Sequence, residues 1–131
     1  MASILRVNTL TDASSNNSTA MSTVNQGTAK NWSVCPVSSG TPSIDDSFNL
    51  ASITDADVGN VYVNLTNAMS SVNYSNLVSR QVVASAGTGS NFVQSVTTAN
   101  RSTSSYRINN FENGSDADPN HYDTQVNGDL A

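Results

Sequence analysis

Apolar and polar residues alternate along much of the chain from residue 32 onward, which is the pattern of β-strands with one buried face. The clearest stretch is 61–66, where valine, valine and leucine stand at the odd positions and tyrosine, asparagine and threonine at the even ones. The stretch 30–35 alternates in the same way and places Trp32 and Val34 on one face. Further strands are expected at 48–53, 74–86, 92–98, 105–111 and 122–126.

Turn-forming residues separate these stretches. Pro36 and the Ser-Ser-Gly-Thr-Pro that follows are expected to end the first strand, and 54–57 with Gly59-Asn60 to form the next turn. Strands spaced at roughly 8–12 residues with polar turns are typical of a sandwich or barrel. We therefore predict an all-β head over 32–131, an antiparallel β-sandwich or jelly-roll-like fold. The stretch 76–85 could also be drawn as a helix, but its valines favour a strand.

Residues 1–31 have a different pattern. A short alternating stretch at 4–10 is followed by twenty residues that are almost wholly small and polar. Such a segment cannot bury itself, so we expect an extended N-terminal arm that pairs with another subunit, or else a disordered tail. No amphipathic helix is expected in it. The apolar residues that would make the oligomer contacts are Ile4, Leu5, Val7, Leu10, Met21 and Val24.

The composition adds a reason to expect a homo-oligomer. Only 37% of the residues are hydrophobic and 6% aromatic, below the usual 45–50% apolar share of a globular domain. About 40% of the residues are Ser, Thr or Asn, which can line a β surface without charges that need partners. Part of the apolar burial is therefore expected to come from neighbouring subunits.

Charge and cysteine usage exclude several classes of protein. The net charge is −5 and the five basic residues are scattered, so no nucleic acid partner is expected. No apolar run approaches the length of a membrane span, and the N-terminus does not have the pattern of a signal peptide. Cys35 is the only cysteine. It cannot form an internal disulfide, and we expect it to be a small buried side chain of a protein made in a cytoplasm.

Few residues could carry catalysis. His121 is the only histidine, and it lies in a loop with turn residues on both sides. No nucleophile elbow is present, so the prediction is a non-enzymatic protein without a cofactor. The nearby acidic residues Asp116, Asp118 and Asp123 are a weak calcium candidate, but they lack the glycine and the closing glutamate of an EF-hand loop. A solvated acidic turn is the preferred interpretation.

Several segments resemble a family of short virion proteins from aquatic tailed phages, cyanophages among them, described as tail-fibre-like or structural. They are ASILRVNTLTDASSNNSTAMSTVNQGTAKNW at 2–32, DSFNLASITD at 46–55, YVNLTNAM at 62–69, VNY at 72–74 and GDLA at 128–131. The resemblance implies a homotrimer, an N-terminal segment for contacts between subunits or with other virion proteins, and a β-sandwich-like head. It implies no catalytic residues. The chain departs from the family pattern after Trp32, in Ser-Val-Cys-Pro-Val-Ser-Ser-Gly.

Three functions remain open at this point. The first is a fibre or spike subunit on the virion exterior, assembled in the host cytoplasm, whose head contacts the host surface and possibly its glycans. The second is a capsid decoration (cement) protein. The third and weakest is a glycan depolymerase that would pair Glu112 with a loop aspartate. For the first, the candidate receptor contacts are the aromatic side chains Tyr74, Tyr106, His121 and Tyr122.

Overall fold

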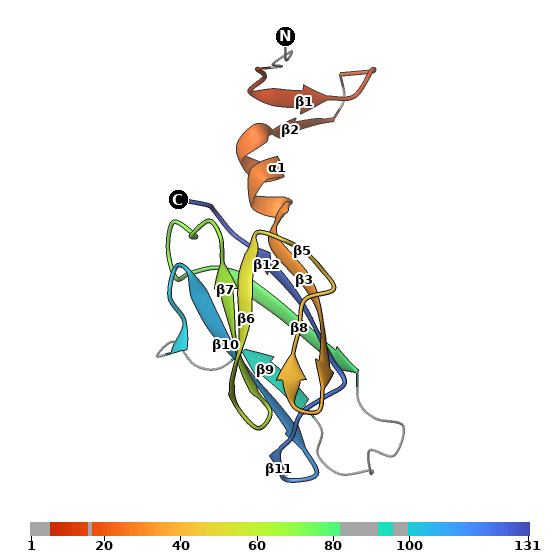
Figure 1. The fold of residues 1–131 in the computed structure, drawn as a ribbon. Helices are drawn as coiled ribbons and strands as arrows, with labels where there is room; N and C mark the ends of the chain where they lie inside the picture. Colours follow the sequence, from red (N-terminus) through yellow and green to blue (C-terminus); the bar gives the residue numbers. More distant parts are fainter. Residues whose placement is uncertain (1–5, 16, 82–91, 96–99) are drawn as a thin grey trace.

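The computed structural model describes residues 6–15, 17–81, 92–95 and 100–131, with only the backbone for 92–95. The chain forms a β head from which an N-terminal arm projects at one end (Figure 1). Ile4 and Leu5 lie outside the described residues, as do the last parts of two expected strands, 82–86 and 96–98.

The arm is not a fully extended segment. It consists of a small antiparallel hairpin, β1 (Thr9–Thr11) with β2 (Ser18–Ala20), followed by the seven-residue helix α1 (Met21–Gly27). The helix ends at Thr28, whose backbone N–H and hydroxyl both donate to the Val24 carbonyl. No residue of α1 is buried. The arm thus contains one short helix, which is defined by local hydrogen bonds and has no buried face.

The first sheet of the head contains β6 (Leu50–Asp57), β7 (Asn60–Leu65), β9 (Phe92–Ser95), β10 (Ser105–Glu112) and β11 (Ser115–Asp116). All its pairings are antiparallel. Strand β10 is central: it pairs with β7 on one edge and with β9 on the other, and its end forms a hairpin with β11. Gly59 makes the tight β6–β7 turn, with φ +70°. A Cβ there would lie 2.6 Å from the Asn110 carbonyl oxygen, so only glycine fits.

The second sheet contains β3 (Ala29–Ser38), β4 (Thr41–Pro42), β5 (Asp46–Phe48), β8 (Ser75–Gln81) and β12 (His121–Asn127). Strand β3 follows the arm directly. It pairs with β12 on one edge and with β4 and β5 on the other, and β12 pairs in turn with β8. The first strand of the two sheets therefore begins at Ala29.

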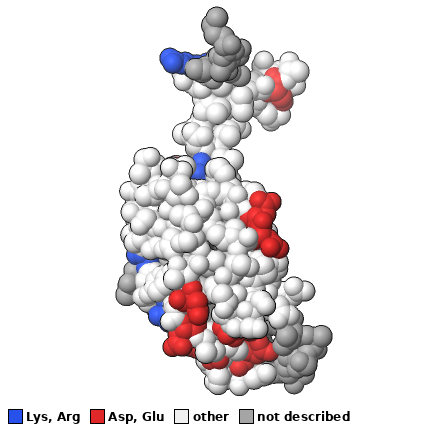
Figure 2. Space-filling view, in the orientation of Figure 1, with Lys and Arg blue, Asp and Glu red and all other residues white. Residues whose placement is uncertain are grey.

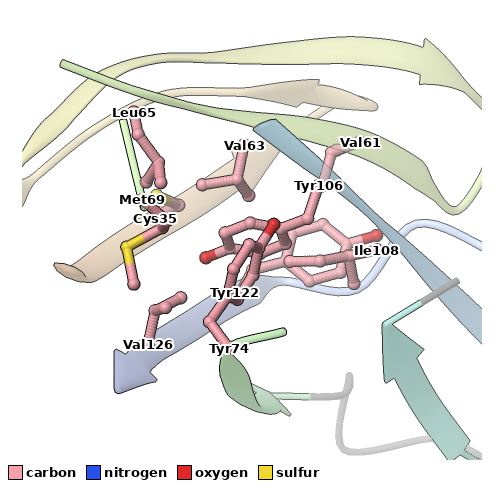
Figure 3. Packing of buried hydrophobic residues seen from close by; sticks show 10 residues of the cluster. All are labelled: Cys35, Val61, Val63, Leu65, Met69, Tyr74, Tyr106, Ile108, Tyr122 and Val126. Carbon is pink, nitrogen blue, oxygen red and sulfur yellow. The ribbon is translucent and has the colours of Figure 1, made fainter. Parts of the chain in front are cut away.

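The core lies between the two sheets. Figure 3 shows side chains from both sheets pointing toward one another. The alternation predicted for 61–66 is confirmed, since Val61, Val63 and Leu65 are buried. In the part of the chain that the structure describes, the other buried hydrophobic residues are Cys35, Met69, Tyr74, Tyr106, Ile108, Tyr122 and Val126. The fold class is thus all-β, with two antiparallel sheets packed as a sandwich.

Two strand boundaries differ from the expected ones. Strand β3 continues through Pro36 to Ser38 and is followed by Ser39 and Gly40, which both have positive φ. Pro36 is tolerated because β5 pairs with β3 up to Val34 and β4 only from Val37. The missing N–H of Pro36 therefore faces the interval between these two short strands and costs no ladder hydrogen bond. Strand β6 likewise continues through the expected turn at 54–57.

The expected strand at 48–53 is divided by Asn49, where the chain passes from the second sheet to the first. Asn49 has φ +57°. Its side-chain amide donates to the Lys30 carbonyl at 2.8 Å, and its Oδ1 accepts from the Asn67 backbone N–H at 2.7 Å. These bonds join the start of β3 to the segment after β7, so the corner between the sheets is held by one side chain.

Candidate functional site

Three of the four candidate receptor contacts are core residues. Tyr74, Tyr106 and Tyr122 are 5%, 0% and 1% exposed. The hydroxyl of Tyr74 donates to the Ser102 carbonyl at 2.9 Å, and that of Tyr106 to Asn31 Oδ1 at 3.2 Å. The prediction that these tyrosines contact a receptor was therefore wrong. The period-two pattern explains why: Tyr106 shares its face of β10 with Ile108, and Tyr122 its face of β12 with Val126.

The three acids of the calcium candidate do not converge. Asp116 accepts hydrogen bonds from the Asn109 and Asn60 amides at 2.9 and 3.1 Å, while Asp118 accepts from the Gly59 N–H at 2.7 Å. Asp123 belongs to β12 in the other sheet. Within the described residues no group of three potential ligands could hold a metal ion. The Asn109 and Asn60 bonds hold the pKa of Asp116 below its usual value. Acidic side chains gather at the end of the head away from the arm (Figure 2).

Glu112, the depolymerase candidate, is held by an arginine. Its Oε2 lies 3.7 Å from Arg80 Nη1, and both side chains are nearly buried. Arg80 also donates to Asn110 Oδ1, and Asn110 Nδ2 donates to the Ala117 carbonyl. These contacts tie β8, β10 and the loop after β11 together. Glu112 thus lies in a structural network.

The outward-facing side chains of β5, β3, β12 and β8 form a surface that we call the outer face. One row across these four strands is Phe48, Trp32, Gln125 and Leu77, each the register partner of the next. Its three apolar members are 49%, 38% and 60% exposed. Large side chains so exposed in one row are unusual on a sheet that does not meet a ligand or partner.

A second row of the outer face is polar at three of its four positions. It runs through Asp46, Val34, Asp123 and Ser79 in the same register. The Asp123 side chain is 46% exposed and accepts from Ser79 Oγ at 3.3 Å. Between β12 and β8 the surface is hollowed by about 280 Å³, lined by Leu77, Val78, Ser79, Asp123, Thr124 and Gln125. Apolar and hydrogen-bonding groups therefore alternate over a short distance.

His121, the remaining candidate contact, lies in the next row of the outer face, between Pro36 and Gln81. Its side chain is 23% exposed, with Nδ1 4.0 Å from Asp123 Oδ1. It borders the hollow instead of lining it.

A buried polar network beneath the outer face fixes its strands. Asn31 Nδ2 donates to the Phe48 carbonyl at 2.9 Å, which holds β5 against β3. Its Oδ1 accepts from the hydroxyls of Tyr106 and Thr124, both at 3.2 Å. Ser33 Oγ lies 2.7 Å from Thr124 Oγ1. Because every bond in this network joins two strands, Trp32 and Phe48 are carried on a rigid support.

Trp32 and Phe48 were not among the candidate site residues, although the sequence contained a signal for one of them. Cys35 was expected to be buried, and it is 0% exposed. Trp32 has the opposite parity in the same strand, so burial of Cys35 turns Trp32 outward. The inner positions of β3 are instead Asn31, Ser33 and Cys35, a polar set that alone would suggest a solvated face.

The apolar residues of the arm form the second candidate contact region. Val7 and Leu10 are 38% and 47% exposed, and Met21 and Val24 on α1 are half-buried. The hairpin joins the helix through the Met21 N–H, which donates to the Asn8 carbonyl at 2.9 Å. Asn127 Nδ2 donates to the Gly27 carbonyl at 3.1 Å, connecting the arm to β12.

No protein-family model, curated protein or solved structure matches the chain. In the part of the chain that the structure describes, no helix is long and apolar enough to cross a membrane.

Proposed function

We propose that this protein is a fibre- or spike-type structural subunit on the exterior of a phage particle. Its arm joins the copies of a homotrimer and attaches them to other virion proteins, and its head contacts the host surface. The observation that carries the proposal is the distribution of exposed apolar side chains. Among the described residues, five of the nine exposed large hydrophobic side chains lie on the arm (Val7, Leu10) or in one row of the outer face (Trp32, Phe48, Leu77). The other four, Ile44, Val58, Val72 and Leu130, lie outside the strands.

Two further arguments support this function. The resemblance of residues 2–32 to short virion proteins agrees with an arm that makes contacts outside its own chain. An arm of this kind also suits capsid decoration, in which small β heads are clamped over neighbouring capsomers. The outer face favours the fibre or spike, because a decoration head has no need for exposed aromatic side chains on the surface turned to solvent.

Labelling of intact particles tests the proposal. Antibody raised against the full chain, detected by gold in electron micrographs, is expected to mark the tail or fibre region, with tens of copies per particle by gel densitometry. Full-length protein added in excess to host cells is expected to reduce adsorption of the phage. Uniform label over the capsid with hundreds of copies would establish decoration, and absence of label from purified particles would refute a virion role.

A further inference from the structure

We infer that the outer face binds a neutral carbohydrate chain, with a sugar ring against Trp32 and sugar hydroxyls bonded to Gln125, Asp123 and Ser79. The inference rests on the proposed function in one respect: it names the class of surface molecule that the head contacts. The binding site itself follows from the residues of the outer face.

The geometry of the outer face suits a sugar. The C–H groups of a hexose ring pack against the electron-rich face of an aromatic side chain, and Trp32 and Phe48 are register partners with exposed rings. Gln125 of β12 is the register partner of Trp32 of β3. Asp123 precedes Gln125 by two residues in β12 and therefore lies on the same face. A carboxylate accepts two or more hydroxyl hydrogen bonds, and an amide both donates and accepts. Four strand positions spaced by about 4.8 Å span about 14 Å, the length of a short oligosaccharide.

Charge selects the kind of carbohydrate. The rows of the outer face that contain the hollow carry Asp46 and Asp123, and none of their described side chains is a lysine or arginine. Arg80 of β8 is turned inward to Asn110 and Glu112. In these two rows, sialylated or uronic-acid glycans would meet carboxylates and no lysine or arginine, whereas neutral hydroxyls donate to the carboxylates.

The same charges argue against a second copy of this chain as the occupant. Interfaces between subunits are depleted of charged residues at their centre. A symmetric contact through the outer face would bury Asp123, which is 46% exposed and has His121 Nδ1 4.0 Å away. Burial of a carboxylate is costly, and a histidine offsets this cost only when it is protonated. A carbohydrate that leaves the far side of Asp123 hydrated avoids this cost.

Tryptophan fluorescence tests the inference directly, because Trp32 is the only tryptophan of the chain. Full-length protein is titrated with neutral oligosaccharides of glucose, galactose, mannose and N-acetylglucosamine, and in parallel with sialylated and uronic-acid oligosaccharides. At least one neutral probe is expected to shift the emission of Trp32 in a saturable manner, and the anionic probes to leave it unchanged. No saturable shift with any neutral probe, or tighter binding of an anionic one, would overturn the inference.

Variants place the site. Trp32→Ala, followed by calorimetry because it removes the reporter, is expected to weaken binding about tenfold or more, as truncation of a central aromatic contact does. Asp123→Asn and Gln125→Ala keep the reporter and are expected to weaken binding several-fold. Tyr62→Ala, an aromatic residue of β7 in the first sheet, is the matched control and should bind as the native chain does. Equal affinity in Asp123→Asn, Gln125→Ala and the native chain would overturn the assignment.

The other outcomes are also distinguishable. If Trp32→Ala lowers the mass of the assembly in light scattering, the outer face is a subunit interface and the carbohydrate site is refuted. If particles are labelled but no neutral probe binds, the virion role stands and only this inference fails. If a probe binds but purified particles carry no label, the site stands and the proposed virion function fails.

Discussion

The arm and the head achieve their structure in different ways. The described part of the arm has no buried residue, and its apolar side chains are exposed or half-exposed. Among its described residues, the head buries ten hydrophobic side chains between two sheets. Both regions are rich in Ser, Thr and Asn, so composition alone does not separate them. The difference lies in spacing: in the head the apolar residues recur at every second position, and in the arm they are isolated.

The head also shows how a chain with few apolar residues closes a core. It buries Asn31, Ser33, Asn60, Asn110 and Thr124 together with the hydrophobic residues. Each of these side chains has a hydrogen-bond partner, which removes most of the cost of burying it. A polar composition is therefore compatible with a self-sufficient head, whereas the described part of the arm buries none of its side chains.

Removal of the arm is the strongest test of this division. A chain lacking residues 1–28 keeps β3 intact, so we expect the head to fold with a cooperative thermal transition close to that of the full chain. Assembly should be lost completely, because the exposed apolar residues of the hairpin and α1 are gone. Circular dichroism and light scattering measure the two properties. A truncated chain that still forms the native oligomer would contradict the role given to the arm.

A pair of apolar truncations compares the two regions directly. Ile108→Ala removes a fully buried side chain and should lower the free energy of unfolding of the head by about 3 kcal/mol. Leu10→Ala removes a side chain that is 47% exposed and should change that free energy by less than about 0.5 kcal/mol, while weakening assembly. Urea denaturation and sedimentation check the pair. Comparable destabilisation of the head by both substitutions would show that the arm is part of its core.

Two buried tyrosines of the head differ in whether the hydroxyl group has a hydrogen-bond partner. Tyr106→Phe removes the hydroxyl that donates to Asn31 and should destabilise the head by about 1 kcal/mol. The hydroxyl of Tyr122 is buried and, among the described residues, has no hydrogen-bond partner. Tyr122→Phe should therefore be neutral or stabilising by up to about 1 kcal/mol. Urea midpoints measured side by side give the signs, and a loss of stability in Tyr122→Phe as large as in Tyr106→Phe would refute the distinction.

The smallest expected effect is a pH dependence at the far end of the head. The pKa of Asp116 is lowered by its bonds to Asn109 and Asn60. Its contribution to stability is thus present above the unfolded pKa, near 3.8, and is lost as the pH falls through the folded value. At neutral pH the urea midpoint of unfolding should be slightly higher for the native chain than for Asp116→Asn. In strong acid the two midpoints should be equal. Asp12→Asn, an arm acid that also accepts from an asparagine, is the control and should leave the head unchanged at both pH values.

The fold class and the strongest strands could be predicted because they depend on local periodicity, as 61–66 shows. The Asn49 corner could not, since asparagine occurs in this chain both within strands and in turns. Which face of β3 points into the core was ambiguous for a similar reason, because the inner face is partly polar. Its Asn31 and Ser33 are buried with hydrogen bonds to Tyr106 and Thr124, which come from distant strands. The outer face combines β5, β3, β12 and β8, which do not follow one another in the sequence. It therefore depends on which strands pair, and the local hydrophobic pattern does not specify that pairing.

The position of β3 has a mechanical consequence. Strand β3 begins where the arm ends and runs along the head, bonded to β12 from Ala29 to Pro36. A pull on the arm against a head held at its outer face acts along β3, so the hydrogen bonds to β12 are loaded side by side and resist together. The β1–β2 hairpin is loaded at its open end, where bonds yield one after another. Under tension the β1–β2 hairpin should open first and lengthen the arm, while the pairing of β3 with β12 keeps the head folded.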